Sequence, residues 1–321
     1  MPPVTSAALM TRFQKLSLGS TAATLLLVAV GGLVRATKSG LGCGTDWPHC
    51  QGLLLPAMEN RAVIIEYSHR VTATVVVLLL GFLAFDAWRE HRHSPRILWP
   101  SLAAFGLVIV QAILGAVVVK LELEAASVVL HLFTAMLLLG LLVYITLAAF
   151  AASGRTAPSD LSLSRASSFA AGSVLALLLV GSYVSGRGAG LAFPDWPLMN
   201  GHLIPDLGPP LAALHFLHRA LALVVAIIVG FVGVRVIRRR EELPMQARLM
   251  HAALGLFAVE ILIGALNVWT DLNAAAVTAH LLTGALIWSS LVAVAVSSHP
   301  ALQRVAGEET VVSVRPALEG G

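Results

Sequence analysis

The chain has 321 residues, of which 57% are hydrophobic and only 12% are charged, whereas soluble domains contain roughly 25% charged residues. This composition excludes a water-soluble globular protein. The long runs of Leu, Val and Ala lack the alternation of polar and apolar residues that a transmembrane β-barrel requires, so that class is excluded as well. We therefore expect an all-α polytopic membrane protein.

Apolar runs without acidic interruption recur along the chain at a length that can cross a bilayer, which takes about 20 residues. The first run follows Arg12 and Lys15, but it is too long for a signal peptide and lacks a small-residue cleavage site, so we interpret it as a retained helix. The sequence thus predicts eight transmembrane helices, at 17–34, 63–85, 97–119, 126–150, 167–185, 211–234, 247–268 and 274–297.

The basic residues predict the orientation of these helices. When successive connections alternate between the two sides, 14 of the 21 Lys and Arg residues fall on the side that holds both termini. Positive charge marks the cytoplasmic side, so both termini are predicted to be cytoplasmic. The formal charge of +4 is then explained by topology, and we expect no nucleic-acid partner and a lipid bilayer as the surroundings.

The two halves of the chain repeat each other at an offset of 149 residues. Asp46-Trp47-Pro48 recurs as Asp195-Trp196-Pro197, and each copy is either an interfacial aromatic anchor or a lid over a pocket. Because each repeat has an even number of spans, both copies have the same orientation. We expect two parallel-repeat four-helix bundles, at 1–150 and 166–297, and a cytoplasmic tail at 298–321. The other residues that recur at this offset are Gly52, Pro56, His69, Arg70, Gly115, His131 and Thr134.

Five histidines lie inside the apolar runs, where ionisable groups are costly and usually functional. Four of them, His69, His131, His218 and His280, lie about 6–8 residues from the outer face, at a depth of roughly 10 Å. Each repeat supplies two, on its second and fourth helices. Two facing imidazoles suit the axial ligation of a haem iron, whereas zinc would need further ligands. The fifth, His215, is next to this set.

Two arginines follow repeated histidines directly. Arg70 and Arg219 would be costly if they faced lipid, and anionic haem propionates would neutralise them. The alternative is that both side chains reach the headgroups. We interpret Gly115 and Gly264 as positions of close packing between helices.

Several segments together resemble haem A synthases: GGLVRATKSGLGCGTDWPHCQG at 31–52, EYSHR at 66–70, the segment from His131 onward, the PDWP–NG loop at 194–201, HFLHR at 215–219 and AHLLTG at 279–284. The resemblance spans roughly residues 17–297. It implies oxidation of the C8 methyl group of haem O to a formyl group by successive hydroxylations, which yields haem A. It also implies a prokaryotic plasma membrane, with haem O synthase and terminal oxidase assembly factors as candidate partners and a homo-oligomer as a further possibility.

The resemblance further implies unequal halves. The C-terminal pair, His218 and His280, would hold a resident haem b, and the N-terminal pair, His69 and His131, would belong to the catalytic site for the substrate haem. Glu66 fits this asymmetry, because the residue 149 positions later is His215. Glu66 shares a helix face with His69 at a spacing of three. We expect it to act as the acid/base or to stabilise a cation; the alternative is an interface carboxylate paired with Arg61 or Arg70.

The only two cysteines, Cys43 and Cys50, both fall in the first outer loop, where an oxidising compartment would favour a disulfide. The CGTDWPHC segment matches neither a covalent haem attachment motif nor a C-x-x-C redox site. The disulfide is interpreted as a staple over the site with a redox-sensitive effect on activity.

Two other functions remain compatible with the histidine pattern. A dihaem b-type membrane electron-transfer cytochrome would use the same ligands, although a carboxylate in one half argues against two equivalent haems. A haem or small-molecule transporter would move its substrate without changing it. Conversion of haem O separates all three.

Overall fold

The computed structural model describes residues 10–153 and 157–305, and within these ranges its regular structure is helical. All eight long helices are long and apolar enough to cross a membrane. The chain is therefore a helical multi-pass membrane protein, as its composition predicts. The helices are α1 (Arg12–Ala36), α2 (Arg61–Glu90), α3 (Pro95–Lys120), α4 (Ala125–Ala151), α5 (Leu161–Gly186), α6 (Pro210–Ile237), α7 (Pro244–Trp269) and α8 (Ala274–Ser297), with a short 3-10 turn η1 at Ala189–Leu191.

Most helices are longer than the apolar runs that predicted them; some begin outside the hydrophobic stretch at a polar cap, and α3, α6 and α7 begin at a proline. Asp160 accepts a hydrogen bond from the backbone N–H of Leu163 and begins α5 six residues before the predicted run. Asn60 and Asn273 cap α2 and α8 in the same way. Helices of 24 to 30 residues are about 36–45 Å long and exceed the roughly 30 Å hydrocarbon core.

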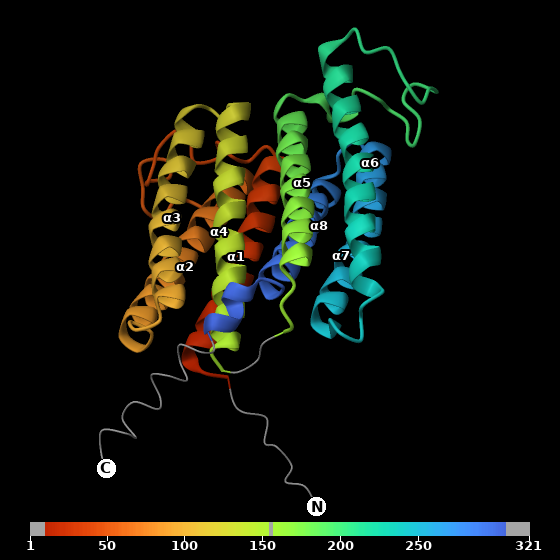
Figure 1. Ribbon diagram of the computed structural model, residues 1–321. Helices are drawn as coiled ribbons and strands as arrows, with labels where there is room; N and C mark the ends of the chain where they lie inside the picture. The colour runs from red at the N-terminus through yellow and green to blue at the C-terminus, as the bar shows by residue number, and fades with distance from the viewer. Residues whose placement is uncertain (1–9, 154–156, 306–321) are drawn as a thin grey trace, which may run out of the picture.

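The helices form two groups, α1–α4 and α5–α8, which lie side by side (Figure 1). In the N-terminal half α2 packs on α1 and α3, and α4 packs on α1 and α3; α5–α8 repeat the same contacts in the C-terminal half. The halves join through α1 against α8, α4 against α5, and α4 against α8. This arrangement is compatible with two parallel four-helix repeats.

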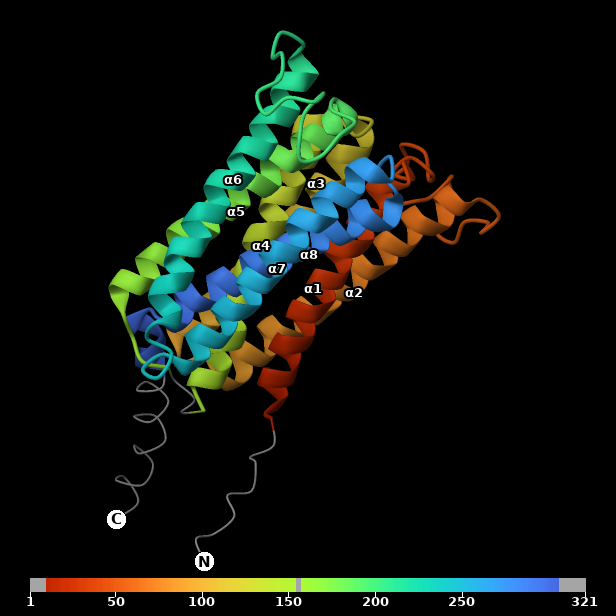
Figure 2. The ribbon, with the colours of Figure 1, turned by 90° about the vertical axis from the view of Figure 1, so that its right-hand side faces the viewer.

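Both long connections, at 37–60 and 187–209, lie at one end of the bundle, which we call the long-loop end. They project beyond the helices there (Figure 2). Arg12 and Val305 lie at the opposite end, which we call the termini end. Predicted topology signals at Arg155 and Arg315 lie outside the described residues, as do 1–9 and 306–321 of the termini.

The backbone geometry of the connections repeats with the sequence. Gln51 and Gly52 have positive φ angles of 54° and 78°, and Asn200 and Gly201 have 53° and 77°. An antiparallel bridge joins Cys50 to Leu53, and its counterpart joins Met199 to His202. Both Trp-Pro peptide bonds, at 47–48 and 196–197, are cis.

The offset of 149 holds from Asp46 onward but becomes 150 before it. Two residues, Gly44 and Thr45, separate Cys43 from Asp46, whereas Pro194 alone separates Phe193 from Asp195. Gly40-Leu41 recurs as Gly190-Leu191 at this longer offset, so Cys43 corresponds to Phe193. In the first helix of each half, corresponding residues are therefore 150 positions apart, and a comparison at a fixed offset of 149 does not match them.

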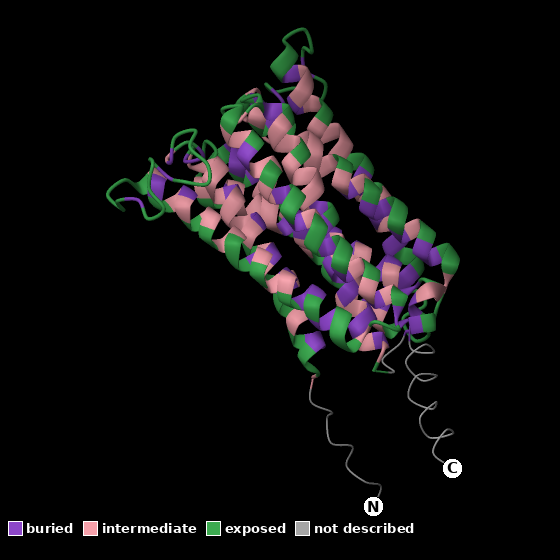
Figure 3. Ribbon diagram, turned by 90° about the vertical axis from the view of Figure 1, so that its left-hand side faces the viewer, coloured by how far each residue is buried: buried purple, intermediate pink, exposed green. Residues whose placement is uncertain are grey.

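Exposed positions alternate with buried and half-buried positions along the helices (Figure 3), and many of the exposed residues are large and apolar. Phe231 on α6 and Leu78 on α2 are 65% and 57% exposed, which suits a lipid environment. The start of the predicted tail is packed: residues 300–305 are helical, and Leu302 and Val305 are buried against the N-terminal half.

Candidate functional site

Four histidines lie at one level near the long-loop end. His69 and His218 each lie eight residues after the first residue of α2 and α6, and His131 and His280 each lie six residues after the first residue of α4 and α8. At 1.5 Å per residue these positions are about 9–12 Å into the helices. Each histidine thus lies about two turns into its own helix from the long-loop end, close to the position that the sequence predicts.

The C-terminal pair has a spacing that suits a shared metal. The ring centroids of His218 and His280 are 6.4 Å apart, with the planes inclined at 76°. A metal lies about 2.0 Å from an imidazole nitrogen, and the ring centre is about 1.1 Å further, so two axial imidazoles have centroids about 6 Å apart. His69 and His131 lie within electrostatic range of each other in the N-terminal half.

Each of the four rings retains an unpaired nitrogen. The Nδ1 atoms of His69, His131, His218 and His280 are buried, with no hydrogen-bond partner among the described residues. Buried polar atoms rarely lack partners, and Nδ1 of His215 is unpaired as well, so this feature alone does not single out the four rings. It shows that no hydrogen bond through Nδ1 fixes these rings, which can therefore turn to present Nε2 to a group that the protein chain does not supply. Within those same residues no cluster of three or more His, Cys, Asp or Glu side chains could hold a bare metal ion. The donor set therefore fits haem iron, which needs only two protein ligands.

Each histidine lies against a glycine of the neighbouring helix. A Cβ atom built on Gly181 of α5 would lie 2.9 Å from Cε1 of His218, and one on Gly31 of α1 would lie 3.2 Å from Cε1 of His69. The corresponding distances are 3.3 Å from Gly115 to His131 and 3.4 Å from Gly264 to His280. Gly115 and Gly264, which we interpret as positions of close packing, therefore pack against the edge of an imidazole ring. Gly31 and Gly181 were not predicted from the sequence, because a fixed offset of 149 does not align them.

Glu66 connects the first long loop to α2. It is 3% exposed, and its Oε2 accepts a hydrogen bond of 2.8 Å from the backbone N–H of Cys43. Its Oε1 lies 2.6 Å from Nη2 of Arg70. Of the two partners that the sequence allows, Arg70 is the one that pairs. Both oxygens are engaged, so this carboxylate is held in place as part of the loop anchor.

The side chain of Arg70 binds the backbone of the same loop. Its Nη1 donates to the carbonyl oxygens of Asp46 at 3.0 Å and His49 at 2.8 Å. A guanidinium has five N–H donors in a rigid fork, which allows it to bind the carboxylate and the loop together. Its predicted role toward a haem propionate stays a prediction, and in this structure its contacts explain the loop.

Arg219 makes the matching contacts in the C-terminal half. Its Nη1 donates to the carbonyl oxygens of Asp195 at 3.1 Å and Leu198 at 3.0 Å. Its Nε donates to Nε2 of His215 at 3.1 Å, in the place where Arg70 meets Glu66. The side chain of Asp195 accepts hydrogen bonds from Gly201 and Asn200, and these backbone N–H groups hold the pKa of Asp195 below its usual range.

The two loops are closed by different chemistry. Cys43 and Cys50 form a disulfide and pack with Val63. The matched positions in the second loop are Phe193 and Met199, which are buried with Ala212. The predicted disulfide is thus present in the structure, and a small apolar cluster takes its place in the other half.

Glu260 is an acidic residue that the sequence-based predictions do not include. The apolar run at 247–268 contains it, and the run at 63–85 contains Glu66, so the expectation of runs free of acidic residues is wrong. Oε1 of Glu260 lies 3.2 Å from Nδ1 of His280. The position 149 residues earlier is Gln111, whose Nε2 donates to the carbonyl oxygen of His131 at 2.9 Å. An offset test applied to every polar residue of the spans would have found this pair.

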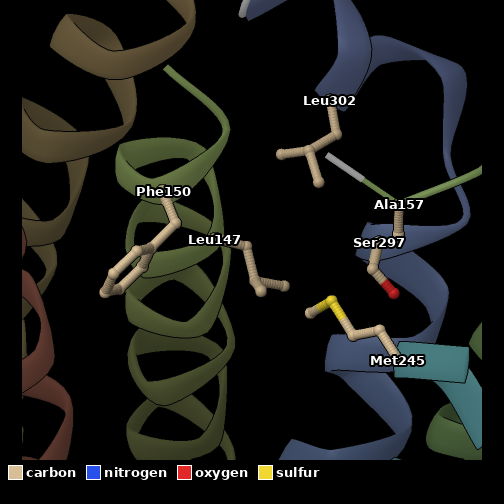
Figure 4. Close-up of a pocket in the computed structure, with 6 residues that line it drawn as sticks. All are labelled: Leu147, Phe150, Ala157, Met245, Ser297 and Leu302. Carbon is tan, nitrogen blue, oxygen red and sulfur yellow. The ribbon is translucent and has the colours of Figure 1, made fainter. Parts of the chain in front are cut away.

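An apolar cavity of about 300 Å³ lies at the termini end, away from the histidines (Figure 4). Its lining side chains contain no titratable group, so it contributes nothing to the chemistry of the histidine sites. They are Leu147, Phe150, Ala157, Met245, Ser297 and Leu302.

Comparison with known proteins identifies relatives of this chain. The chain is 32% identical over 199 residues to a protein of Alkalihalophilus pseudofirmus, covering 61% of this chain and 66% of the relative. It is 31% identical over 217 residues to a protein of Halalkalibacterium halodurans, covering 64% and 71%. A protein of Geobacillus thermodenitrificans is 27% identical over 277 residues, covering 84% and 87%.

All three relatives are named heme A synthase, which confirms the resemblance seen in the sequence motifs. Residues 14–292 match the family described as cytochrome oxidase assembly protein, and this range takes in all four histidines, Glu66, Glu260 and both long loops. With a match over most of its length, the chain belongs to the cytochrome oxidase assembly protein family.

Proposed function

We propose that this protein is a haem A synthase, which oxidises the C8 methyl group of haem O to a formyl group by successive hydroxylations. The observation that carries the proposal is the pair of histidine sites at one depth, with ring centroids 6.4 Å apart in the C-terminal half. The names of the relatives support the same reaction.

The two halves would have different tasks. His218 and His280 would hold a resident haem b, and His69 and His131 would hold the substrate haem in the catalytic half. A haem b bound in the C-terminal half would supply electron transfer. The glycines beside all four rings would let the imidazoles stand where axial ligation requires them, because a Cβ at those positions would crowd the ring edge.

Glu66 would act in the catalytic half as a fixed negative charge. Arg70 and the N–H of Cys43 hold both of its oxygens, so it is oriented in advance of the reaction. Such a charge stabilises positive charge that develops at a carbon under oxidation. Its link to Cys43 also ties it to the Cys43–Cys50 disulfide, so reduction of the disulfide would release one of its anchors.

The decisive experiment is extraction of haem from cells that make haem O, with and without this protein. The proposal requires a formyl-bearing haem by mass only when the protein is present. A dihaem electron carrier would leave haem O unchanged, and a transporter would move it without altering its mass.

Single variants then assign the roles within that assay. Glu66→Ala should retain bound haem but stop formyl production, and Glu66→Gln removes the charge and one of the two acceptor contacts while keeping a similar shape. His215→Gln is the matched control, since it alters the corresponding position beside Arg219. His218→Ala should lose the resident chromophore. Normal haem A production by both Glu66 variants would show that Glu66 has no catalytic role.

The remaining expectations concern the surroundings of the enzyme. We propose a prokaryotic plasma membrane with both termini in the cytoplasm, as the distribution of Lys and Arg predicts. Haem O synthase, terminal oxidase assembly factors and a second copy of this chain are candidate partners. Fusion of a cytoplasm-active reporter to either terminus tests the orientation, and cross-linking in membranes tests the partners.

A further inference from the structure

Glu260 is a carboxylate inside a membrane-spanning helix, where acidic residues are costly and normally face a functional partner. It lies on α7, nine residues before the end of the helix at Trp269. Its side chain is only 16% exposed, and its Oε1 is 3.2 Å from Nδ1 of His280. The partner is therefore one of the two histidines of the C-terminal pair.

Both groups have unmet hydrogen-bonding capacity. Nδ1 of His280 is buried without a hydrogen bond, because its 3.2 Å approach to Oε1 is not aligned for one, and Oε2 of Glu260 is buried without a partner in the described part of the chain. Leaving a buried donor and acceptor unpaired costs more than a small rotation of either side chain. A ring turned to present its Nε2 to iron can align its Nδ1–H with Oε1.

The C-terminal half also provides the space that this carboxylate needs. A Cβ atom on Gly284 of α8 would lie 3.1 Å from Oε1 of Glu260 and 2.7 Å from Cδ2 of Leu178 on α5, so both side chains use the space that this glycine leaves. The corresponding residue of the N-terminal half is Ala135, and the residue that corresponds to Glu260 is Gln111. Gln111 accepts a hydrogen bond from Thr134 at 2.5 Å and lies 3.3 Å from Nε2 of His131. Carboxylate and glycine thus occur together in one half, and amide and alanine in the other.

We propose that Glu260 is a positioning residue whose Oε1 accepts a hydrogen bond from Nδ1–H of His280 and thereby makes this imidazole a stronger ligand of the resident haem iron. The inference rests on the proposed haem between His218 and His280. Hydrogen bonding of a ligating histidine to a carboxylate fixes the tautomer and raises the basicity of the coordinating nitrogen. A more basic ligand favours ferric iron, so this haem is harder to reduce than one whose histidine lacks such a partner.

The test uses the full-length protein, purified with its haem, and measures the midpoint potential of the resident haem by redox titration. Glu260→Gln gives this position the residue found in the N-terminal half. We expect the ratio of reduced to oxidised haem at a fixed potential to rise about tenfold, which is about 59 mV for a one-electron couple. The electron paramagnetic resonance signal of the ferric haem should shift while the spectrum still indicates two histidine ligands.

Gly284→Ala, combined with Leu178→Ala to remove the closer clash with Cδ2 of Leu178, provides a second variant that leaves Glu260 in place and presses on its Oε1. It should shift the potential in the same direction by a smaller amount. Ala135→Gly is the matched control in the N-terminal half and should leave the resident haem unchanged. If Glu260→Gln loses its haem, the midpoint potential of the variant that combines Gly284→Ala with Leu178→Ala is the test: a shift supports the proposal, and an unchanged potential contradicts it.

Two failures can be told apart. If His280→Ala keeps the wild-type haem content and the spectrum of a haem with two histidine ligands, and His69→Ala does not remove that haem, the proposed haem site itself is overturned. A wild-type protein with haem held by two histidines, and an unchanged potential and resonance signal in both Glu260→Gln and the variant that combines Gly284→Ala with Leu178→Ala, would overturn only the role of Glu260.

Discussion

The four glycines that face the histidines allow a graded prediction, since one substitution, Gly→Ala, meets a different gap at each position. Ordinary contacts between carbon atoms are about 3.5–4.0 Å. The new Cβ would lie 2.9 Å from the ring at Gly181 and 3.4 Å at Gly264. The His218 ring must therefore move by about 0.6 Å or more, whereas the His280 ring needs to move by only about 0.1 Å.

These displacements can be compared with what a metal site tolerates, which is about 0.2 Å in its bond lengths. Gly181→Ala exceeds that tolerance and Gly264→Ala does not. Overpacking costs about 1–3 kcal/mol, and replacing Gly by Ala within a helix recovers about 0.5–1 kcal/mol. We expect Gly181→Ala to lose up to about 2 kcal/mol of stability and much of its bound haem, and Gly264→Ala to be neutral or slightly more stable.

The assay is the haem-to-protein ratio of the purified variants from their absorption spectra, together with the melting temperature from intrinsic tryptophan fluorescence. In the N-terminal half, the gaps at Gly31 and Gly115 are 3.2 and 3.3 Å, so both substitutions to Ala should lower haem O conversion to a similar, intermediate extent. Equal haem loss in Gly181→Ala and Gly264→Ala, or wild-type haem content in Gly181→Ala, would refute the idea that the glycines exist to accommodate the rings.

Three further changes test the loops and caps. Cys43→Ser opens the disulfide loop, whose closure contributes about 2–3 kcal/mol by chain entropy, so the melting temperature should fall. Haem A formation should fall more than haem content, because the backbone N–H of residue 43 that binds Glu66 is no longer held by the disulfide. Arg219→Lys cannot reach His215 and the loop carbonyls together, so limited proteolysis should cut the loop at 187–209 faster than in wild type. Asp160→Ala removes the cap of α5 and should cost about 1 kcal/mol at pH 7, whereas Asp160→Asn should cost less. The N–H of Leu163 and the guanidinium of Arg239 lower the pKa of Asp160. The contribution of Asp160 to stability is therefore complete above pH ~4 and is lost as the pH falls through the lowered pKa. The melting temperatures of wild type and Asp160→Ala should accordingly converge in acid.

The helices and the level of the histidines could be predicted from sequence because both depend on counting residues along one helix. Hydrophobic length determines the spans, and the distance of His69 and His280 from a helix start determines their depth. The disulfide followed from two cysteines that share one loop. All of these features are local or repeat at a constant offset.

Contacts between helices could not be predicted in the same way. Glu260 was hidden because it lies in a strongly apolar run, and its meaning depends on α8, which supplies both His280 and Gly284. The arginines were assigned by charge alone, yet their N–H groups point to loop carbonyls that are more than 20 residues away along the chain. Such partners are determined by how the helices pack, and single-sequence spacing does not encode that packing.

The positions that differ between the halves are the ones that would give them different tasks. Each half has one buried carboxylate near its histidines, but on a different helix: Glu66 on α2 is tied to Arg70, and Glu260 on α7 lies behind His280. In the other half, the residue that corresponds to Glu66 is His215, which accepts a hydrogen bond from Arg219. The residue that corresponds to Glu260 is Gln111, which donates to the backbone carbonyl of His131. A charge held at the loop can act on a substrate at the edge of a site, whereas a charge behind a ligand can act only through the metal. If this placement determines the division of labour, we expect Glu66→Gln to lower haem A formation without shifting the potential of the resident haem, and Glu260→Gln to shift that potential while substrate binding is retained.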